Sequence, residues 1–159
     1  MKALAAAILA LKHVDRAGWL RVGIAQPESV AAHSFGVATL GLVLCPPELD
    51  RSRVVAIALL HDLAESVVGD ITPHDGVSVD EKRRQERTAA AQLFAGRPDL
   101  WALWEDYEQD RSPEAHFVHE LDKLDMALQA GAYASEADTA QFVESALKKL
   151  RSPALLSLL

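Results

Sequence analysis

Apolar residues along this chain recur every three to four positions, and no stretch shows a convincing alternation of apolar and polar residues. A spacing near 3.6 residues is typical of amphipathic α-helices, whereas strands alternate with a period of two. Capping residues, glycines and prolines then indicate where helices end. The pattern predicts helices at about 2–14, 30–44, 52–67, 78–95, 99–108, 114–132 and 136–150, with loops over 15–28 and 70–79. We therefore expect an all-α, compact multi-helix bundle.

The apolar run at residues 3–11 could belong to a signal peptide or to a first helix. No small-residue cleavage site follows it, and Leu4, Ile8 and Leu11 are spaced as on one helix face, which favours a helix of the mature domain. No apolar stretch approaches the ~20 residues that a membrane span requires. We expect no membrane partner.

Composition narrows the class of protein further. The 159 residues are 50% hydrophobic and 25% charged, as in one soluble domain covering 1–159. The net charge of -7 argues against a nucleic-acid polymer as partner, because such binders usually carry a basic face. Cys45 is the single cysteine, so the chain has no internal disulfide; we expect a buried structural thiol and a reducing, cytoplasmic setting.

Four residues that can bind metals lie on helix faces that are otherwise apolar: His33, His61, Asp62 and Asp122. A carboxylate among leucines costs free energy unless it is paired or binds a metal. Two imidazoles and two carboxylates make a mixed N/O ligand set for a divalent transition metal. The three segments can converge, because each candidate lies where its helix packs. Glu65, four residues after His61, can reach the same site.

Other histidines have simpler explanations. A single histidine on an apolar face is more often a hydrogen-bonded core residue than a ligand, and a His-Asp pair can arise by chance. The chain contains a second such pair, His74-Asp75, in a loop with no helical stripe after it. We interpret this pair as unrelated to metal binding, and His13, His116 and His119 as surface or packing residues.

Two further groups have alternative readings. Trp101, Trp104 and Tyr107 could form a base-stacking platform, but the core face of a short helix is favoured. Asp125, three residues after Asp122, is interpreted as a hydrogen-bonding neighbour of that carboxylate.

The basic run at residues 82–84, with Arg87, could be a phosphate-binding patch. Glu81 and Glu86 interleave with it, so a solvated helix face is favoured.

The order His33, His61-Asp62, Asp122 resembles the H…HD…D pattern of the HD-domain metal-dependent phosphohydrolases. The resemblance is greater to the 5'-deoxynucleotidase branch of that family, and it extends from about residue 9 to residue 150. It is carried by the stretches 27–34, 61–65, 69–73, 81–84 and 117–129, together with Arg16 and Trp19 upstream.

The resemblance implies that His33, His61, Asp62 and Asp122 hold one divalent cation, with Mn, Co, Fe, Ni, Zn and Mg all open. It implies that Glu65 and Asp70 are catalytic or substrate-binding carboxylates. Together with the backbone carbonyl of Ile71, these two could hold a second ion.

For the substrate, the resemblance implies that Arg16 contacts phosphate and takes part in catalysis, and that Trp19 lines a nucleoside pocket. Lys123 is a weaker candidate for phosphate contact. Asp70 is suited to accept a hydrogen bond from a sugar 3'-hydroxyl, because Gly69 lets the backbone bend this carboxylate back toward the site.

The implied activity is metal-dependent hydrolysis of 2'-deoxyribonucleoside 5'-monophosphates by a homodimer. Two alternatives stay open: HD-type hydrolysis of another small phosphate ester or nucleotide, and a non-catalytic nucleotide- or metal-binding regulatory module. The short chain argues against larger substrates. Glu65 and Asp70 argue against a regulatory module, since a purely structural metal site needs neither.

Overall fold

The computed structural model describes residues 2–159, and every regular element within them is a helix. The helices, in chain order, are α1 (Lys2–Leu11), α2 (Ala17–Arg21), α3 (Val30–Leu44), α4 (Arg51–Leu60), α5 (Glu65–Val68), α6 (Val79–Leu93), α7 (Pro98–Glu108), α8 (Pro113–Tyr133), α9 (Ala140–Lys149) and α10 (Pro153–Leu156). An isolated bridge between Asp15 and Ser29 is the one strand-like pairing in this range. The predicted all-α class is confirmed.

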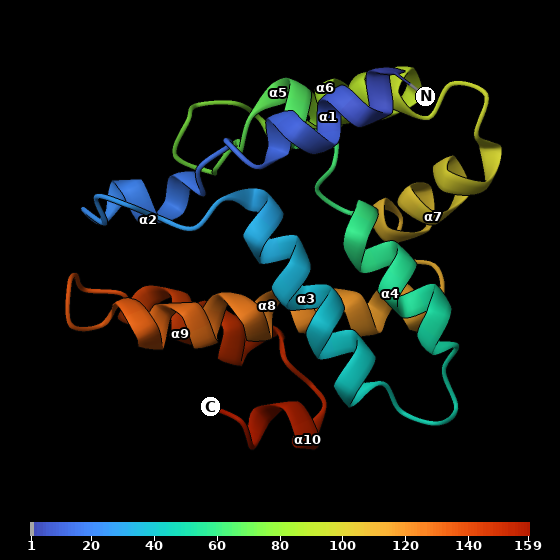
Figure 1. Cartoon of the computed structure of the whole chain (residues 1–159). Helices are drawn as coiled ribbons and strands as arrows, with labels where there is room; N and C mark the ends of the chain where they lie inside the picture. The colour runs from blue at the N-terminus through green and yellow to red at the C-terminus, as the bar shows by residue number, and fades with distance from the viewer. Residues whose placement is uncertain (1) are drawn as a thin grey trace.

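Helices α3, α4 and α8 cross at the centre of the molecule (Figure 1). Gly41 of α3 shows how closely they approach: a Cβ there would lie 2.8 Å from Val54 of α4 and 3.3 Å from Leu121 of α8. Around this crossing lies the largest apolar cluster of the described residues. Helices α1, α5 and α6 lie together to one side, and α9 packs along α8. The crossing helices therefore form a rigid support for side chains at their ends.

The helix predicted over 52–67 is wrong in one respect, because it is interrupted. Helix α4 ends at Leu60 and α5 begins at Glu65. In between, the N–H groups of Leu63 and Glu65 donate to carbonyls three residues back, at 3.1 and 3.0 Å, rather than four. Adjacent residues on a regular helix point about 100° apart. The tighter turn lets His61 and Asp62 face one point.

Other boundaries also differ from the prediction. Helix α1 ends at Leu11 rather than near residue 14, and the last long helix begins at Ala140 rather than near 136. The predicted loop 15–28 contains α2, and α10 follows the last predicted helix. Helices of four or five residues show little more than one turn, so hydrophobic periodicity cannot reveal them.

Side-chain caps fix the starts of four helices. Ser29, Asp50, Ser78 and Ser112 each accept a hydrogen bond from a backbone N–H in the first turn of the following helix. Such a cap stabilises a helix by about 1 kcal/mol. The cap at Ser29 starts α3 four residues before His33 and so sets where that histidine lies.

Several expected core residues are buried. Cys45 and Tyr107 are both 7% exposed, and Trp104 is 1% exposed within an apolar cluster that Trp101 also contacts. The core interpretation of these aromatic residues is confirmed. Among residues 2–159, no helix combines the length and the apolar character needed to cross a membrane.

Candidate metal centre

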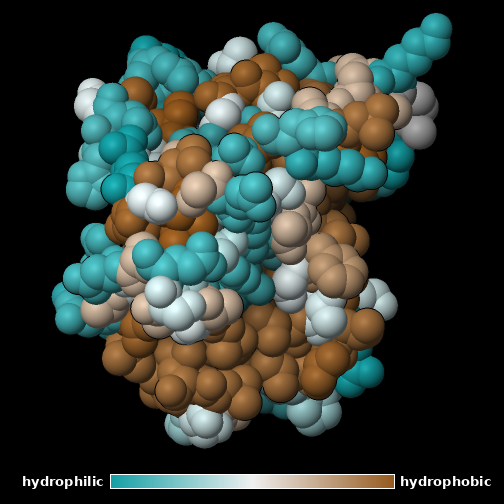
Figure 2. Space-filling view, turned by 60° about the vertical axis from the view of Figure 1, so that its left-hand side comes forward, coloured by the Kyte–Doolittle hydropathy of each residue, from teal (hydrophilic) through white to brown (hydrophobic). Residues whose placement is uncertain are grey.

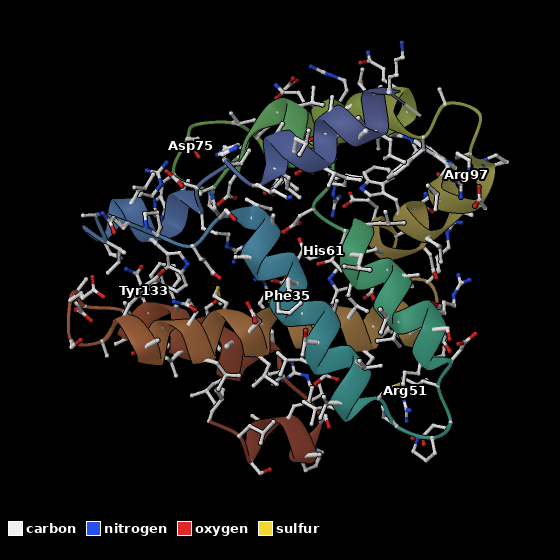
Figure 3. All side chains as sticks on the ribbon, in the orientation of Figure 1. Phe35, Arg51, His61, Asp75, Arg97 and Tyr133 are labelled. Atoms are coloured by element: carbon white, nitrogen blue, oxygen red, sulfur yellow. The ribbon has the colours of Figure 1, made fainter. Side chains whose placement is uncertain are left out.

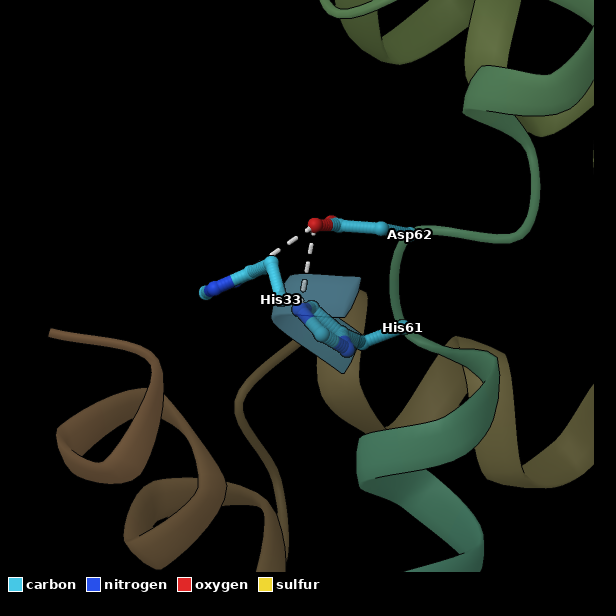
Figure 4. Close-up of side chains that lie close together, drawn as sticks. All are labelled: His33, His61 and Asp62. Carbon is cyan, nitrogen blue, oxygen red and sulfur yellow. Dashed lines mark ion pairs between the residues drawn. The ribbon is translucent and has the colours of Figure 1, made fainter. Parts of the chain in front are cut away.

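Three of the four predicted metal ligands meet where α3 passes the end of α4 (Figure 4). His33 comes from the second turn of α3, and His61 and Asp62 follow the last residue of α4. The Nε2 atoms of His33 and His61 lie 3.8 and 3.1 Å from Asp62 Oδ2. Both imidazoles are buried, at 0% and 3% exposure. One ligand atom from each residue lies within 4.8 Å of the other two.

Hydrogen bonds at Nδ1 orient both imidazoles. His61 Nδ1 lies 2.7 Å from the carbonyl oxygen of Ala58, and His33 Nδ1 lies 2.7 Å from Asp125 Oδ2. A carbonyl oxygen only accepts, so His61 Nδ1 carries the proton and its Nε2 presents a lone pair. Partners of this kind commonly fix the tautomer of metal-binding histidines.

The buried Nε2 atoms of His33 and His61 have no hydrogen-bond partner. They point at carboxylate oxygens, which in the ionised form cannot donate a hydrogen bond. A cation between them would satisfy two lone pairs and neutralise the carboxylate of Asp62 at once. The donor set of this cluster therefore fits a divalent transition metal.

Asp122 lies at the edge of this cluster. Its Oδ1 is 3.2 Å from His33 Nε2, while its Oδ2 lies 2.9 Å from Lys123 Nζ and accepts a long bond of 3.5 Å from the Tyr107 hydroxyl. It is not within the mutual 4.8 Å of the other three. Burial opposes its charge, but the charge of Lys123 and the proximity of His33 hold the pKa of Asp122 well below its usual range.

Asp125 has a different role from the one predicted. It was expected to bond to Asp122, but its partner is His33 Nδ1. One helical turn separates the two aspartates on α8, so Asp122 lies near one nitrogen of the His33 ring and Asp125 bonds to the other. The sequence could not show this, because the pairing depends on where α3 crosses α8.

Carboxylates flank both nitrogens of the His33 ring and favour its protonated form. Burial and the charge of Arg16 oppose protonation of His33, but the nearby carboxylate of Asp122 and the hydrogen bond to Asp125 raise its pKa to about 9. For Asp62, burial is again opposed by the histidines and Arg16, which lower its pKa. A metal ion and a proton therefore compete for His33.

Glu65 is buried beside the cluster at the start of α5, with 4% exposure. Its Oε2 has no hydrogen-bond partner, and its Oε1 lies 3.9 Å from Lys82 Nζ. Burial, and then the charges of Asp62 and Asp70, raise the pKa of Glu65. A carboxyl group with a raised pKa is, when ionised, a stronger base than an ordinary glutamate, and this suits it to proton transfer.

The cluster opens into a cavity of about 880 Å³. Small-molecule sites commonly measure about 300–1,000 Å³. Its lining includes every residue that the sequence suggested for substrate or a second ion: Arg16, Trp19, Glu65, Asp70, Ile71 and Lys123. The structure brings these residues together from α2, α5, the loop after α5, and α8.

Arg16 and Asp70 are connected through the start of α2. The Ala17 N–H donates to Asp70 Oδ2 at 2.8 Å, and Arg16 Nη1 lies 3.8 Å from Asp62 Oδ2. Burial opposes the charge on Arg16, but the surrounding carboxylates raise its pKa. Gly69 turns the chain before Asp70 with φ +80° and ψ 169°, a conformation that is essentially restricted to glycine.

Trp19 and Lys123 border the cavity in different ways. Trp19 is 1% exposed, packs against Tyr133 and Phe142, and donates its indole N–H to Glu28 Oε1 at 3.1 Å. It therefore offers the cavity an apolar ring and no free donor. Lys123 has a side chain 33% exposed, with its ammonium group on Asp122.

The prediction that the basic run at 82–84 is a solvated face is wrong for Lys82. Its ammonium donates to the carbonyl of Ile71 at 2.9 Å and lies 3.4 Å from Glu86. Arg84 and Arg87 are on the solvated side, as predicted, and pair with glutamates. Helical spacing could have placed Lys82 correctly. It lies on the same face of α6 as three buried residues: Glu86, Ala89 and Leu93.

The second His-Asp pair lies outside the buried cluster (Figure 3). Asp75 accepts hydrogen bonds from Thr72 and pairs with Arg21, and His74 is exposed at the edge of the cavity. His13 is exposed, and His116 is exposed and pairs with Asp110. His119 stacks on Tyr107 with ring centroids 3.9 Å apart. These placements agree with the surface or packing roles predicted for them.

Helices crossing over a buried His/Asp cluster define the class of this protein as an all-α domain with a candidate metal centre. The family model described as HD domain matches residues 8–155. The chain belongs to the HD-domain family.

Named relatives narrow the comparison. The chain is similar to 5'-deoxynucleotidase HDDC2 of Bos taurus, at 44% identity over 77% of this chain and 62% of the relative, and of Homo sapiens, at 41% over 77% and 63%. It is 38% identical to 5'-deoxynucleotidase hdd1 of Schizosaccharomyces pombe over 83% of this chain and 73% of that protein. The chain thus spans somewhat less than two thirds of the length of the mammalian relatives.

Solved structures share the fold. A crystal structure of a Pyrococcus horikoshii protein aligns with a TM-score of 0.85 and 35% identity, covering 99% of this chain and 94% of that one. A predicted metal-dependent phosphohydrolase from Magnetospirillum magnetotacticum aligns with a TM-score of 0.67 and 31% identity, covering 81% and 69%.

Proposed function

We propose that this protein is a metal-dependent phosphomonoesterase that hydrolyses 2'-deoxyribonucleoside 5'-monophosphates to deoxynucleoside and phosphate. The observation that carries the proposal is the pair of unpartnered Nε2 atoms, on His33 and His61, facing Asp62 at one wall of a cavity that also holds Arg16 and Glu65. Relatives named 5'-deoxynucleotidase support the same substrate class.

The proposed ion is a divalent cation held by His33, His61, Asp62 and Asp122. When bound, such an ion supplies positive charge to a phosphate oxygen and lowers the pKa of a bound water from 15.7 toward ~7. Which of Mn, Co, Fe, Ni, Zn or Mg occupies the centre is set by availability and geometry, since a His/Asp set accepts several of them.

The chain's own residues then perform positioning and proton transfer. Arg16, whose guanidinium lies 3.8 Å from Asp62, is placed to donate to equatorial phosphate oxygens and stabilise the charge that develops on them. In its ionised form, Glu65 can orient the attacking water or take its proton at the unpartnered Oε2. Lys123, beside Asp122, is within the same cavity wall and can assist with phosphate.

Sugar recognition is assigned to Asp70 and Trp19. Asp70 uses Oδ2 for the Ala17 N–H, which leaves Oδ1 to accept a hydrogen bond from a 3'-hydroxyl. Trp19 has its N–H committed to Glu28, so its ring offers a 2'-hydroxyl no partner. A buried hydroxyl without a partner costs about 1–3 kcal/mol, or roughly tenfold to a hundredfold in kcat/KM.

A phosphate-release assay with Mn²⁺-loaded protein tests the proposal. We expect kcat/KM for dAMP to exceed that for AMP by about tenfold to a hundredfold, and deoxyadenosine 3'-monophosphate to react poorly. Equal values for dAMP and AMP would leave a general HD-type phosphohydrolase. Nucleotide binding without release of phosphate from any substrate would favour the regulatory module instead.

We also propose a homodimer, formed through the exposed face of α3, in the cytoplasm. Phe35, Leu42 and Val43 are 70%, 56% and 72% exposed. Figure 2 shows that the lower part of one face of the molecule is largely apolar. Exposed apolar surface of this kind is typical of interaction sites. Light scattering with Phe35→Glu and Val43→Glu variants tests it: the proposal expects monomers, and unchanged mass would contradict it.

A further inference from the structure

A smaller cavity adjoins the main one and is lined by α6 and the C-terminal half of α7. Its volume is about 360 Å³, in the lower part of the range for small-molecule sites. Its walls are formed by Arg83, Arg87, Trp104, Glu108 and Gln109. Arg83 and Glu108 also line the main cavity, so the two cavities are neighbours. None of the residues assigned above to the metal or to substrate lines the smaller one.

The indole N–H of Trp104 is an unused hydrogen-bond donor at this cavity. Trp104 is 1% exposed, and its Nε1 has no hydrogen-bond partner. A buried donor without a partner costs free energy, and in folded proteins such groups are nearly always paired. Trp19, in the wall of the main cavity, is paired in this way with Glu28. The wall of the smaller cavity therefore lacks an acceptor.

Two arginines bring positive charge to the same cavity. Arg83 and Arg87 lie four residues apart on α6 and so share one face of that helix. The guanidinium of Arg87 lies 5.0 Å from the centre of the Trp101 ring and pairs with Glu105. Arg83 forms no ion pair within residues 2–159. Its charge is thus available to a ligand.

The donors around this cavity suit a phosphate group. Gln109 accepts from Arg111 through Oε1, which leaves its amide NH₂ group to donate. Together with the two guanidinium groups and the Trp104 indole, this makes four donor groups from two helices. A phosphate offers three or more strong acceptor oxygens, whereas a carboxylate offers two. Guanidinium groups also bind phosphate through two parallel hydrogen bonds.

We propose that the cavity between α6 and α7 binds a phosphate group, either free or carried by a nucleotide, at a site separate from the metal centre. Arg83 and Arg87 bind its oxygens from α6, and Trp104 and Gln109 donate from the other wall. Glu108 is the one acidic residue of the lining and opposes binding through its charge. The site needs no hydrolysis to exist, and it lies beside the cavity in which the proposed reaction releases phosphate.

Tryptophan indole resonances distinguish the two cavities, because Trp104 lines the smaller one and Trp19 lines the main one. The protein is labelled with ¹⁵N-tryptophan and loaded with Zn²⁺, whose filled d shell leaves the spectrum undisturbed. Titration with inorganic phosphate should shift the Trp104 signal, which the Trp104→Phe variant identifies by its loss. Chloride at equal ionic strength is the control for general screening.

A second titration distinguishes the two sources of the phosphate group. It uses the phosphonate analogue of dAMP, whose carbon–phosphorus bond is not hydrolysed. A Trp104 shift with inorganic phosphate alone would support the site and assign it to free phosphate. A shift with the analogue at lower concentration would support the site and assign it to a nucleotide.

Variants of the lining test the charges. Arg83→Gln and Arg87→Gln should each weaken the phosphate Kd read at Trp104 by about fivefold or more, because a charged donor is lost. Arg83 has no ion pair to disturb, so its variant keeps the test valid if Arg87→Gln loosens the fold. Glu108→Gln should bind phosphate more tightly, since a like charge is removed. Arg84→Gln is the matched control on α6, because Arg84 is exposed and lines neither cavity.

Three results would overturn the proposal. The first is a Trp104 signal that does not move at about 10 mM phosphate, roughly tenfold above a Kd of 1 mM. The second is an equal shift with chloride. The third is an unchanged Kd in both arginine variants. Failure of the proposed function would appear separately, as absence of phosphate release from every nucleotide, and would leave the Trp104 shift as it is.

Discussion

Replacing Gly36 by alanine tests how the metal centre is supported. Gly36 lies three residues after His33 on α3, where α3 passes Asp125 of α8. A Cβ at this position would lie 2.1 Å from Asp125 Oδ1 and 3.0 Å from its Cγ. Ordinary van der Waals contact begins at 3.4 Å, so the carboxylate oxygen must move by about 1.3 Å. That movement breaks or weakens the 2.7 Å hydrogen bond to His33 Nδ1.

The competing free energies decide the sign of the effect. Alanine in place of glycine inside a helix normally stabilises the fold by about 0.5–1 kcal/mol. Overpacking costs about 1–3 kcal/mol, and losing a hydrogen bond to a charged group costs about 1.5–3 kcal/mol more. We therefore expect Gly36→Ala to lower the free energy of unfolding. Loss of the partner that orients His33 should also weaken metal binding about 10–100-fold.

Thermal unfolding and Mn²⁺ titration at one pH measure both effects. Gly131→Ala is the matched control, because Gly131 lies in α8 with no heavy atom within 4 Å of an added Cβ. That control should be slightly stabilised and bind Mn²⁺ normally. If Gly36→Ala instead melts higher and keeps the Mn²⁺ affinity of the unchanged chain, then the hydrogen bond to Asp125 does not support metal binding by His33.

Two further predictions concern protons and chemistry. His33 has a pKa raised to about 9 from its usual 6.5, so the metal-free protein gains stability from its protonation below pH 6.5 and loses it as the pH rises through about 9. Mn²⁺ binding at pH 7.5 should release about one proton, because the ion displaces the proton on His33. Calorimetry in buffers of different ionisation enthalpy measures the number of protons released. A binding enthalpy that is the same in all buffers would contradict the prediction. Glu65→Ala should lower kcat by about 10²-fold or more while most of the metal stays bound. Metal analysis together with steady-state kinetics separates a role of Glu65 in the chemistry from a role in holding the metal. If metal and turnover were lost in parallel, Glu65 would be mainly a metal ligand.

The long helices and the metal-binding residue types could be predicted from the sequence alone. Helix α3 begins at its serine cap and ends before a Pro-Pro pair, and both signals are local. His33, His61 and Asp62 stood out because polar residues on apolar faces need a compensating partner. Their meeting in one cluster follows from the packing of those faces.

Other features depend on tertiary contacts that no local pattern encodes. After Leu60, backbone N–H groups bond to carbonyls three residues back instead of four, which interrupts the helix. The sequence pattern there predicts a continuous helix. The partner of Asp125 depends on the crossing of α3 and α8. Lys82 was assigned to solvent because its neighbours are charged, although its helical position places it on the buried stripe of α6. For Lys82, the position on the helix predicts burial better than the charge of the neighbouring residues does.

The proposed function requires that the His/Asp cluster hold the ion on which hydrolysis depends. The most direct measurement is bound divalent metal and dAMP turnover in parallel for His61→Ala and for His74→Ala, which alters the other His-Asp pair. We expect His61→Ala to lose nearly all metal and all turnover, and His74→Ala to keep its metal. Stoichiometric metal and normal turnover in His61→Ala would contradict the assignment.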